Sequence, residues 1–196
     1  MNAIICGASL VGWAAFLAAL ATRAERSLTG KSSFLVSFAP AAALAASVAV
    51  ARPEEALARG AVLVALAVGA VADARTGYIF DCITLPAAAA GIVIAQVAHD
   101  VDSAVGALAI VLPFALFAAA SWIGWGDVKA IFSLAIAFGP FESSLALFVA
   151  CLCGIVYARA RGRRSCPSRI PFVPPLATGA FVAFIIARPL RIFIGG

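Results

Sequence analysis

Asp73 and Asp127 are the two acidic residues whose surroundings point most directly to chemistry. Asp73 ends an apolar run, and Asp127 begins another after the segment Trp-Ile-Gly-Trp-Gly. An ionisable side chain at membrane depth or at its edge is costly, so it indicates a functional site. Two carboxylates that share a site cannot both ionise easily, and such a pair supplies a general base for water and a general acid for a leaving amine. The residue types therefore suit hydrolysis of an amide bond by water.

The sequence offers few residues suited to other kinds of catalysis. The chain has a single histidine, His99, and no His-Glu-x-x-His segment, so a histidine-based metal cluster is excluded. Its five cysteines form neither a Cys-x-x-Cys pair nor a disulfide framework. We expect no cofactor and no metal ion.

The composition predicts the elements that must position the two aspartates. Of the 196 residues, 64% are hydrophobic and 12% are charged, whereas soluble domains carry about 25% charged residues. This composition excludes a soluble domain and a disordered chain. Alanine-rich runs favour helices over barrel strands. We predict an all-α, polytopic integral membrane helical bundle, with residues 1–196 forming one transmembrane domain and no separate soluble domain.

The number of membrane crossings is predicted from the apolar runs, of which about eight can be counted. The short run 128–138 gives only about 16 Å of helix, against a hydrocarbon core of about 30 Å. One long kinked helix over 128–158 is therefore an alternative, but it would move the most basic loop to the opposite face. The eight runs cover residues 3–22, 34–51, 60–74, 82–98, 104–123, 128–138, 141–158 and 171–190.

The basic residues predict the orientation of these crossings. The net charge of +5 lies mainly in short loops, which indicates membrane topology and not a nucleic-acid partner. With eight crossings, four loops fall on the cytoplasmic side and hold ten of the 14 Lys and Arg residues. Two crossings separate Asp73 from Asp127, so both are predicted at the cytoplasmic boundary. The four loops lie around residues 23–33, 75–81, 124–129 and 159–169.

Most other acidic residues are interpreted as solvated loop charges. Near the two aspartates, Gly124 and Gly126 would allow close approach of an extended peptide. Lys129 lies two residues after Asp127 and would not face it on a helix, so an anchor at the membrane surface and a catalytic role both remain open for it. The loop acids are Glu25, Glu54, Glu55, Asp100, Asp102 and Glu142, and Asp81 lies in a loop close to Asp73.

Three segments resemble the prepilin peptidase (type IV leader peptidase) family of Gly-x-Gly-Asp intramembrane aspartic proteases. Residues 124–129 read Gly-Trp-Gly-Asp-Val-Lys, and residues 73–81 read Asp-Ala-Arg-Thr-Gly-Tyr-Ile-Phe-Asp. Residues 170–174 read Ile-Pro-Phe-Val-Pro, similar to the family's start of the last helix. Phe80 and Asp81 depart from the family's usual Pro and Asn. The resemblance covers about residues 60–190.

The resemblance implies an activity, site residues and a substrate. Asp73 and Asp127 would be catalytic, and Gly124, Gly126, Arg75 and Lys129 would support them or the approach of substrate. The substrate would be a prepilin or pseudopilin, whose short basic leader is removed at the cytoplasmic face of the bacterial inner membrane. The first loop lacks the cysteine-bearing insertion of longer members, so the chain is similar to the short, peptidase-only branch of tight-adherence pilus systems. The resemblance thus does not extend to N-methylation.

Three alternatives remain from the sequence. Two membrane acids could instead serve as the proton relay of a transporter or channel subunit. A Gly-x-Gly-Asp protease of the presenilin or signal-peptide-peptidase type is disfavoured by the short length and by the 73–81 pattern. A structural membrane scaffold would leave the two boundary acids unexplained.

Overall fold

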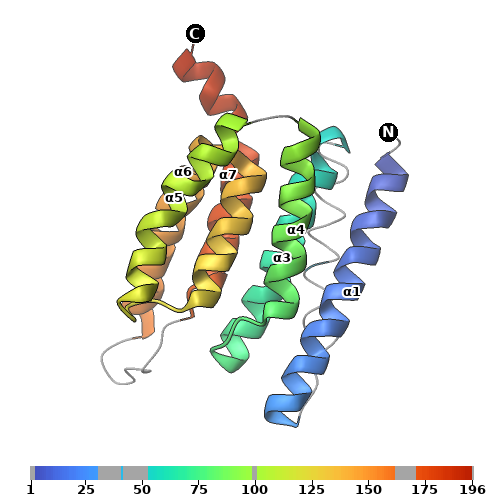
Figure 1. The fold of residues 1–196 in the computed structure, drawn as a ribbon, viewed down its shortest axis with the longest axis vertical. Helices are drawn as coiled ribbons and strands as arrows, with labels where there is room; N and C mark the ends of the chain where they lie inside the picture. Colours follow the sequence, from blue (N-terminus) through green and yellow to red (C-terminus); the bar gives the residue numbers. More distant parts are fainter. Residues whose placement is uncertain (1–2, 31–40, 42–52, 99–100, 162–170, 196) are drawn as a thin grey trace.

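The computed structural model describes residues 3–30, 41, 53–98, 101–161 and 171–195. These residues form helices connected by short turns and contain no strand, which confirms the all-α prediction. Figure 1 shows the helices side by side with their axes along the long direction of the molecule. The helices are α1 (Ala3–Thr29), α3 (Pro53–Thr76), α4 (Asp81–Ala98), α5 (Val101–Ala119), α6 (Trp125–Arg161) and α7 (Val173–Gly195).

Helix α6 consists of two arms that meet at Gly139. The backbone angles of Gly139 (φ 74°, ψ 174°) are not helical, and Pro140 follows. The Ser143 hydroxyl donates a hydrogen bond to the Leu134 carbonyl over 3.4 Å, although nine residues of a continuous helix rise about 13 Å. The chain therefore reverses direction at Gly139, and Figure 1 shows the second arm returning beside the first. This reversal agrees with treating 128–138 and 141–158 as separate segments.

The predicted count of eight crossings is not confirmed. Two helical stretches, Ile5–Thr29 and Trp125–Arg159, are long and apolar enough to cross a membrane, and the second contains the reversal. Shorter apolar helices span Asp81–Val93, Val105–Ala119 and Val173–Ala187. The predicted crossing at 34–51 lies outside the described residues, apart from Ala41.

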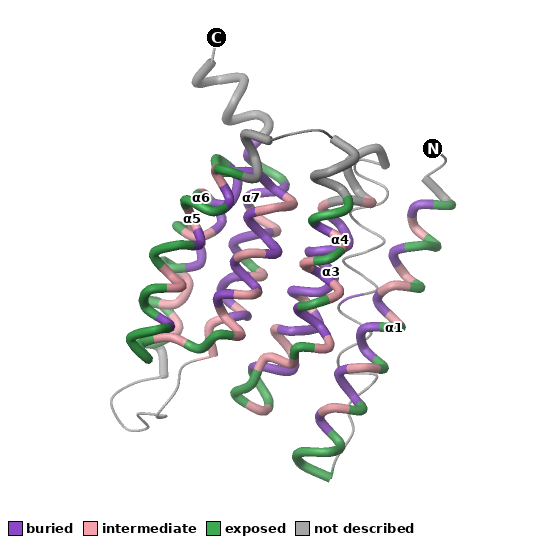
Figure 2. The backbone as a smooth tube through the Cα atoms, in the orientation of Figure 1, coloured by how far each residue is buried: buried purple, intermediate pink, exposed green. Residues whose placement is uncertain are grey.

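The outer side of α5 carries a stripe of exposed large apolar side chains. Val105, Leu108, Leu112 and Leu116 are each more than 60% exposed. Their spacing of three or four residues places them on one face of the helix, and Figure 2 shows the exposed residues along that side. In a helical membrane protein, such a face is suited to contact with lipid tails.

Small residues allow the helices to approach closely at the centre of the bundle. A Cβ atom on Gly179 of α7 would lie 2.1 Å from the Ala146 carbonyl oxygen of α6, so only glycine fits there. Small residues at crossings are typical of membrane helix packing, where backbones come into direct contact. The hydrophobic core of the bundle includes Phe138, Leu134 and Leu176, which are fully or almost fully buried.

Two acids interpreted as solvated loop charges are buried instead, which corrects that interpretation. Glu25 is 5% exposed and pairs with Arg75 over 2.9 Å, and Glu142 is 3% exposed and pairs with Arg59 over 2.9 Å. Glu25 lies where α1 extends beyond its apolar run, and Glu142 lies within the apolar run 141–158, just after the reversal of α6. A buried carboxylate needs a charged partner. Of the other loop acids, Asp100 lies outside the described residues, and the side chains of Glu54, Glu55 and Asp102 are not described.

Candidate active site

Asp73 lies in the last turn of α3 and is almost buried. Its exposed fraction is 5%, and its Oδ2 accepts a hydrogen bond from the Val173 amide over 3.0 Å. The helix ends at Gly77, whose positive φ (69°) suits glycine and whose amide donates to the Asp73 carbonyl over 2.8 Å. The end of α3 and the start of α7 thus hold this carboxylate together.

Asp127 lies in the first turn of α6. Its Oδ2 accepts a hydrogen bond from the Gly124 amide over 3.3 Å, while the Gly124 carbonyl accepts one from the Asp127 amide over 3.1 Å. This reciprocal arrangement corresponds to half of a capping box, in which an acid at the third helical position reaches back to the N-cap residue. The Gly-x-Gly-Asp segment therefore fixes the carboxylate at the helix N-terminus.

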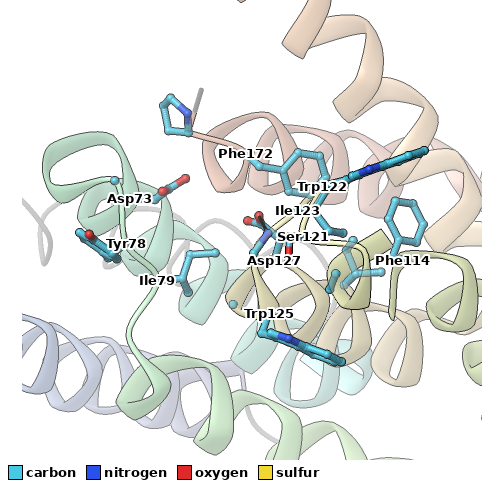
Figure 3. A pocket seen from close by; sticks show the side chains of 16 residues that line it. Asp73, Tyr78, Ile79, Phe114, Ser121, Trp122, Ile123, Trp125, Asp127 and Phe172 are labelled. Atoms are coloured by element: carbon cyan, nitrogen blue, oxygen red, sulfur yellow. Dashed lines mark hydrogen bonds between the residues drawn. The ribbon is translucent and has the colours of Figure 1, made fainter. Parts of the chain in front are cut away.

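The two carboxylates face the same cavity, which has a volume of about 920 Å³. Figure 3 shows Asp73 and Asp127 directed into one space from different helices. Their hydrogen bonds go to backbone amides, and none joins one carboxylate to the other in the described part of the chain. Across the same residues, no group of three or more His, Cys, Asp or Glu side chains is placed to hold a metal ion.

The cavity lies at the end of the bundle where α3 turns into α4 and α5 turns into α6 (Figure 1). The α5 end is closed by Ser121 at a positive φ of 63°, with backbone hydrogen bonds from Ser121 to Ala118 and from Trp122 to Phe117. This is the Schellman pattern, and the Trp122 ring stacks on the Phe117 ring at 5.5 Å as its apolar contact. The turn thereby places Trp122 at the cavity.

The α3–α4 linker packs directly against the Gly-x-Gly-Asp segment. A Cβ atom on Gly126 would lie 3.0 Å from the Ile79 Cβ, so a larger residue would push the linker away. Gly126 therefore allows close approach of a segment of the same chain. Gly124 also lines the cavity, and a Cβ there would meet Asp127 Oδ2 at 3.4 Å, an ordinary contact distance.

Arg75 and Lys129, the basic residues of the two motif segments, do not line the cavity. Arg75 Nε lies 2.9 Å from Glu25 Oε1 of α1, and Lys129 Nζ lies 2.6 Å from Asp81 Oδ1 of α4. Each basic residue therefore pairs with an acid on another helix and not with the aspartate two residues before it. Sequence reasoning placed Asp81 close to Asp73 but did not identify either ion pair.

Several residues of the cavity were not identified from the sequence. Phe114 comes from within α5, where nothing distinguishes it from the other aromatic residues of an apolar run. Phe172 lies in the Ile-Pro-Phe-Val-Pro segment, which marked the start of the last helix but not a wall of the cavity; Ile170 of that segment is outside the described residues. The unpredicted residues along the cavity include Tyr78, Ile79, Phe114, Ala118, Ser121, Trp122, Ile123, Ile131, Pro171 and Phe172.

The comparisons with known proteins identify the family. The profile of the type IV leader peptidase family matches residues 60–159, just over half of the chain. No curated protein and no solved structure matches the chain. The matched part contains Asp73, Asp127 and the linker between α3 and α4, and the helical membrane fold agrees with it. The chain therefore belongs to the type IV leader peptidase family and is a membrane peptidase of that kind.

Proposed function

We propose that the chain is an intramembrane aspartic endopeptidase that removes the short basic leader of type IV prepilins or pseudopilins. The observation that carries the proposal is that Asp73 and Asp127 come from different helices and face one cavity. The leader would be removed at the cytoplasmic boundary of the bacterial inner membrane.

The reaction requires that the two carboxyl groups share one proton, so that one of them is ionised while the other is protonated. The ionised member removes a proton from a water molecule, and the water oxygen attacks the carbonyl carbon of the scissile bond. The protonated member donates to the carbonyl oxygen as negative charge develops there. When the intermediate collapses, a proton passes to the leaving amine, so one water is consumed and no cofactor takes part. The pair would titrate as a unit.

The residues along the cavity favour one orientation of the bound substrate, with its apolar part on one side and its basic leader on the other. On the α5 side the wall is aromatic and apolar, with Phe114, Trp122 and Phe172. Phe114 lies five residues before the end of α5, or about 8 Å inside the helix. We infer that the first apolar residues of the mature pilin helix bind along this wall, while the basic leader leaves toward the solvent beyond Tyr78, which is 56% exposed.

The proposal is tested by co-expressing the chain with a pilin-like substrate and following the size of the substrate. The wild type is expected to shorten the substrate, and Asp73→Asn or Asp127→Asn is expected to leave it uncut. Asp81→Asn is the matched control, because Asp81 lies at the same end of the bundle, is exposed and does not line the cavity. Loss of the Asp81–Lys129 ion pair should change the rate of substrate cleavage by less than about fivefold. Cleavage by either active-site variant would overturn the proposed pair.

The same experiment separates the peptidase from a proton-coupled transporter or channel subunit. A transporter would depend on both acids for flux but would never shorten a pilin-like protein. No observation in the described structure favours that alternative. The resemblance does not support methyl transfer, so the processed substrate is expected to carry an unmodified new N-terminus unless another enzyme acts on it.

A further inference from the structure

We propose that Glu25 of α1 is a positioning residue for Asp73, acting through Arg75. Glu25 lies outside the part of the chain that matches the family profile. The inference rests on the proposed role of Asp73 in peptide hydrolysis and adds a residue from the first helix to that site. Two observations support it: the Glu25–Arg75 ion pair, and the orientation of Arg75 toward α1.

Arg75 and Asp73 hold the last turn of α3 from opposite sides. Two residues apart on a helix differ by about 200° in direction. Asp73 accordingly faces α7 and the cavity, where it binds the Val173 amide, and Arg75 faces α1, where it binds Glu25. A helix end has unpaired carbonyls and frays readily. The two contacts together fix the turn that carries the carboxylate.

The Glu25–Arg75 pair is suited to this role because its acid is buried. The Glu25 side chain is only 6% exposed to solvent, while the Arg75 side chain is 36% exposed. A fully exposed pair contributes little to stability, whereas a carboxylate shielded from water attracts its partner more strongly, so Glu25 holds Arg75 against α1. The pair also joins helices that pack along their length, since α1 contacts α3. Loss of the charge on Glu25 should therefore loosen the α3 end.

The same arrangement recurs at Asp127, which supports the inference. Lys129 lies two residues after Asp127, points away from the cavity and binds Asp81 of α4 over 2.6 Å. In that pair the Asp81 side chain is 60% exposed. We therefore expect a weaker effect at Asp81 than at Glu25, and the difference in burial is the physical reason.

Glu25→Gln is the test variant, because it keeps the shape of the side chain and removes its charge. Glu142→Gln is the matched control. Glu142 is equally buried and is paired with an arginine at the same distance of 2.9 Å, but it follows the reversal of α6 and does not line the cavity. Both variants are expected to lower the unfolding temperature of the purified chain in detergent by similar amounts.

The first readout is steady-state cleavage of a leader peptide. Glu25→Gln is expected to lower kcat about tenfold with little change in KM, because misplacing a reacting group impairs chemistry more than binding. Glu25→Asp, which keeps the charge, should recover part of this loss. Glu142→Gln should stay within about twofold of wild-type kcat. Wild-type kcat in Glu25→Gln, or an equal loss in both glutamine variants, would overturn the proposal.

The second readout does not need activity. Hydrogen–deuterium exchange reports the opening of the α3 end through the Gly77 amide, which binds the Asp73 carbonyl. Glu25→Gln is expected to speed exchange at Gly77 roughly tenfold, and Glu142→Gln is expected to leave it unchanged. Unchanged exchange in Glu25→Gln rejects the positioning role whatever the activity. Faster exchange in a chain that cleaves no leader would keep the positioning role and reject the proposed function.

Discussion

The amide of Val173 donates a hydrogen bond to Asp73 Oδ2 over 3.0 Å, although 100 residues separate the two in sequence. Val173 is the first residue of α7, so its amide has no partner within that helix. The N-terminus of a helix favours negative charge. This contact explains why the start of the last helix belongs to the site even though none of its side chains is ionisable.

Val173→Pro tests this hydrogen bond. Proline is well tolerated at the first position of a helix, so the substitution removes the donor with little damage to α7. Hydrogen bonds to charged groups contribute about 1.5–3 kcal/mol, and we expect kcat/KM for a leader peptide to fall about tenfold or more. Val173→Ala is the control, since it trims the same buried side chain and keeps the amide. An equal loss in both variants would mean that the hydrogen bond has no role.

The sequence predicted that Asp73 and Asp127 lie at the same end of the bundle, but it did not predict their hydrogen-bond partners. Apolar runs and basic loops are local features, and they are enough to show that two crossings return Asp127 to the end that holds Asp73. A partner such as Val173 contributes only a backbone amide, which no residue type reveals. The same reasoning failed for Glu25 and Glu142, because no local feature shows that α1 continues past its apolar run or that the reversal of α6 brings Glu142 to Arg59 of α3.

Phe114→Ala tests the aromatic wall of the cavity. Loss of a buried aromatic contact with an apolar substrate residue removes about 1.5–3 kcal/mol. We expect kcat/KM to fall about tenfold or more for peptides with a large apolar residue after the scissile bond. Peptides with alanine at that position should be much less affected by the substitution.

Leu116→Ala is the control for Phe114. Both residues lie on α5, but Leu116 is 63% exposed and does not line the cavity. Its substitution should leave the preference of the peptidase for the residue after the scissile bond unchanged. If Leu116→Ala shifts this preference as strongly as Phe114→Ala, the substrate helix does not follow the cavity wall described here.

Gly179→Ala tests the close crossing of α6 and α7. The added Cβ would lie 2.1 Å from the Ala146 carbonyl oxygen, so the helices must separate, and we expect a destabilisation of about 3 kcal/mol. Gly154→Ala is the opposite case, because nothing lies within 4 Å of its Cβ position and alanine is favoured over glycine inside a helix by about 1 kcal/mol. Unfolding temperatures in detergent should fall for the first variant and hold or rise for the second. An equal response at both positions would contradict the crossing.

The sequence could not distinguish these two glycines. Both lie inside apolar helical segments, and the difference between them depends on which face of each helix meets a neighbour. That choice is made by packing between segments far apart in the chain, as at Gly126 and Ile79. The reversal at Gly139 was easier to anticipate, because Gly-Pro interrupts an apolar run and the basic loop after α6 argued for two segments.

The most direct test is to purify Asp73→Asn, Asp127→Asn and the double variant in parallel and to measure the rate at which each cleaves a leader peptide in the same detergent. Because the two carboxylates are proposed to act as one unit, each single variant should lose about 1,000-fold or more in kcat, and the double variant should lose no more than either. All three proteins should keep the wild-type unfolding temperature within a few degrees. A single variant that retains substantial cleavage, or a double variant whose loss equals the product of the two single losses, would contradict the proposed pair.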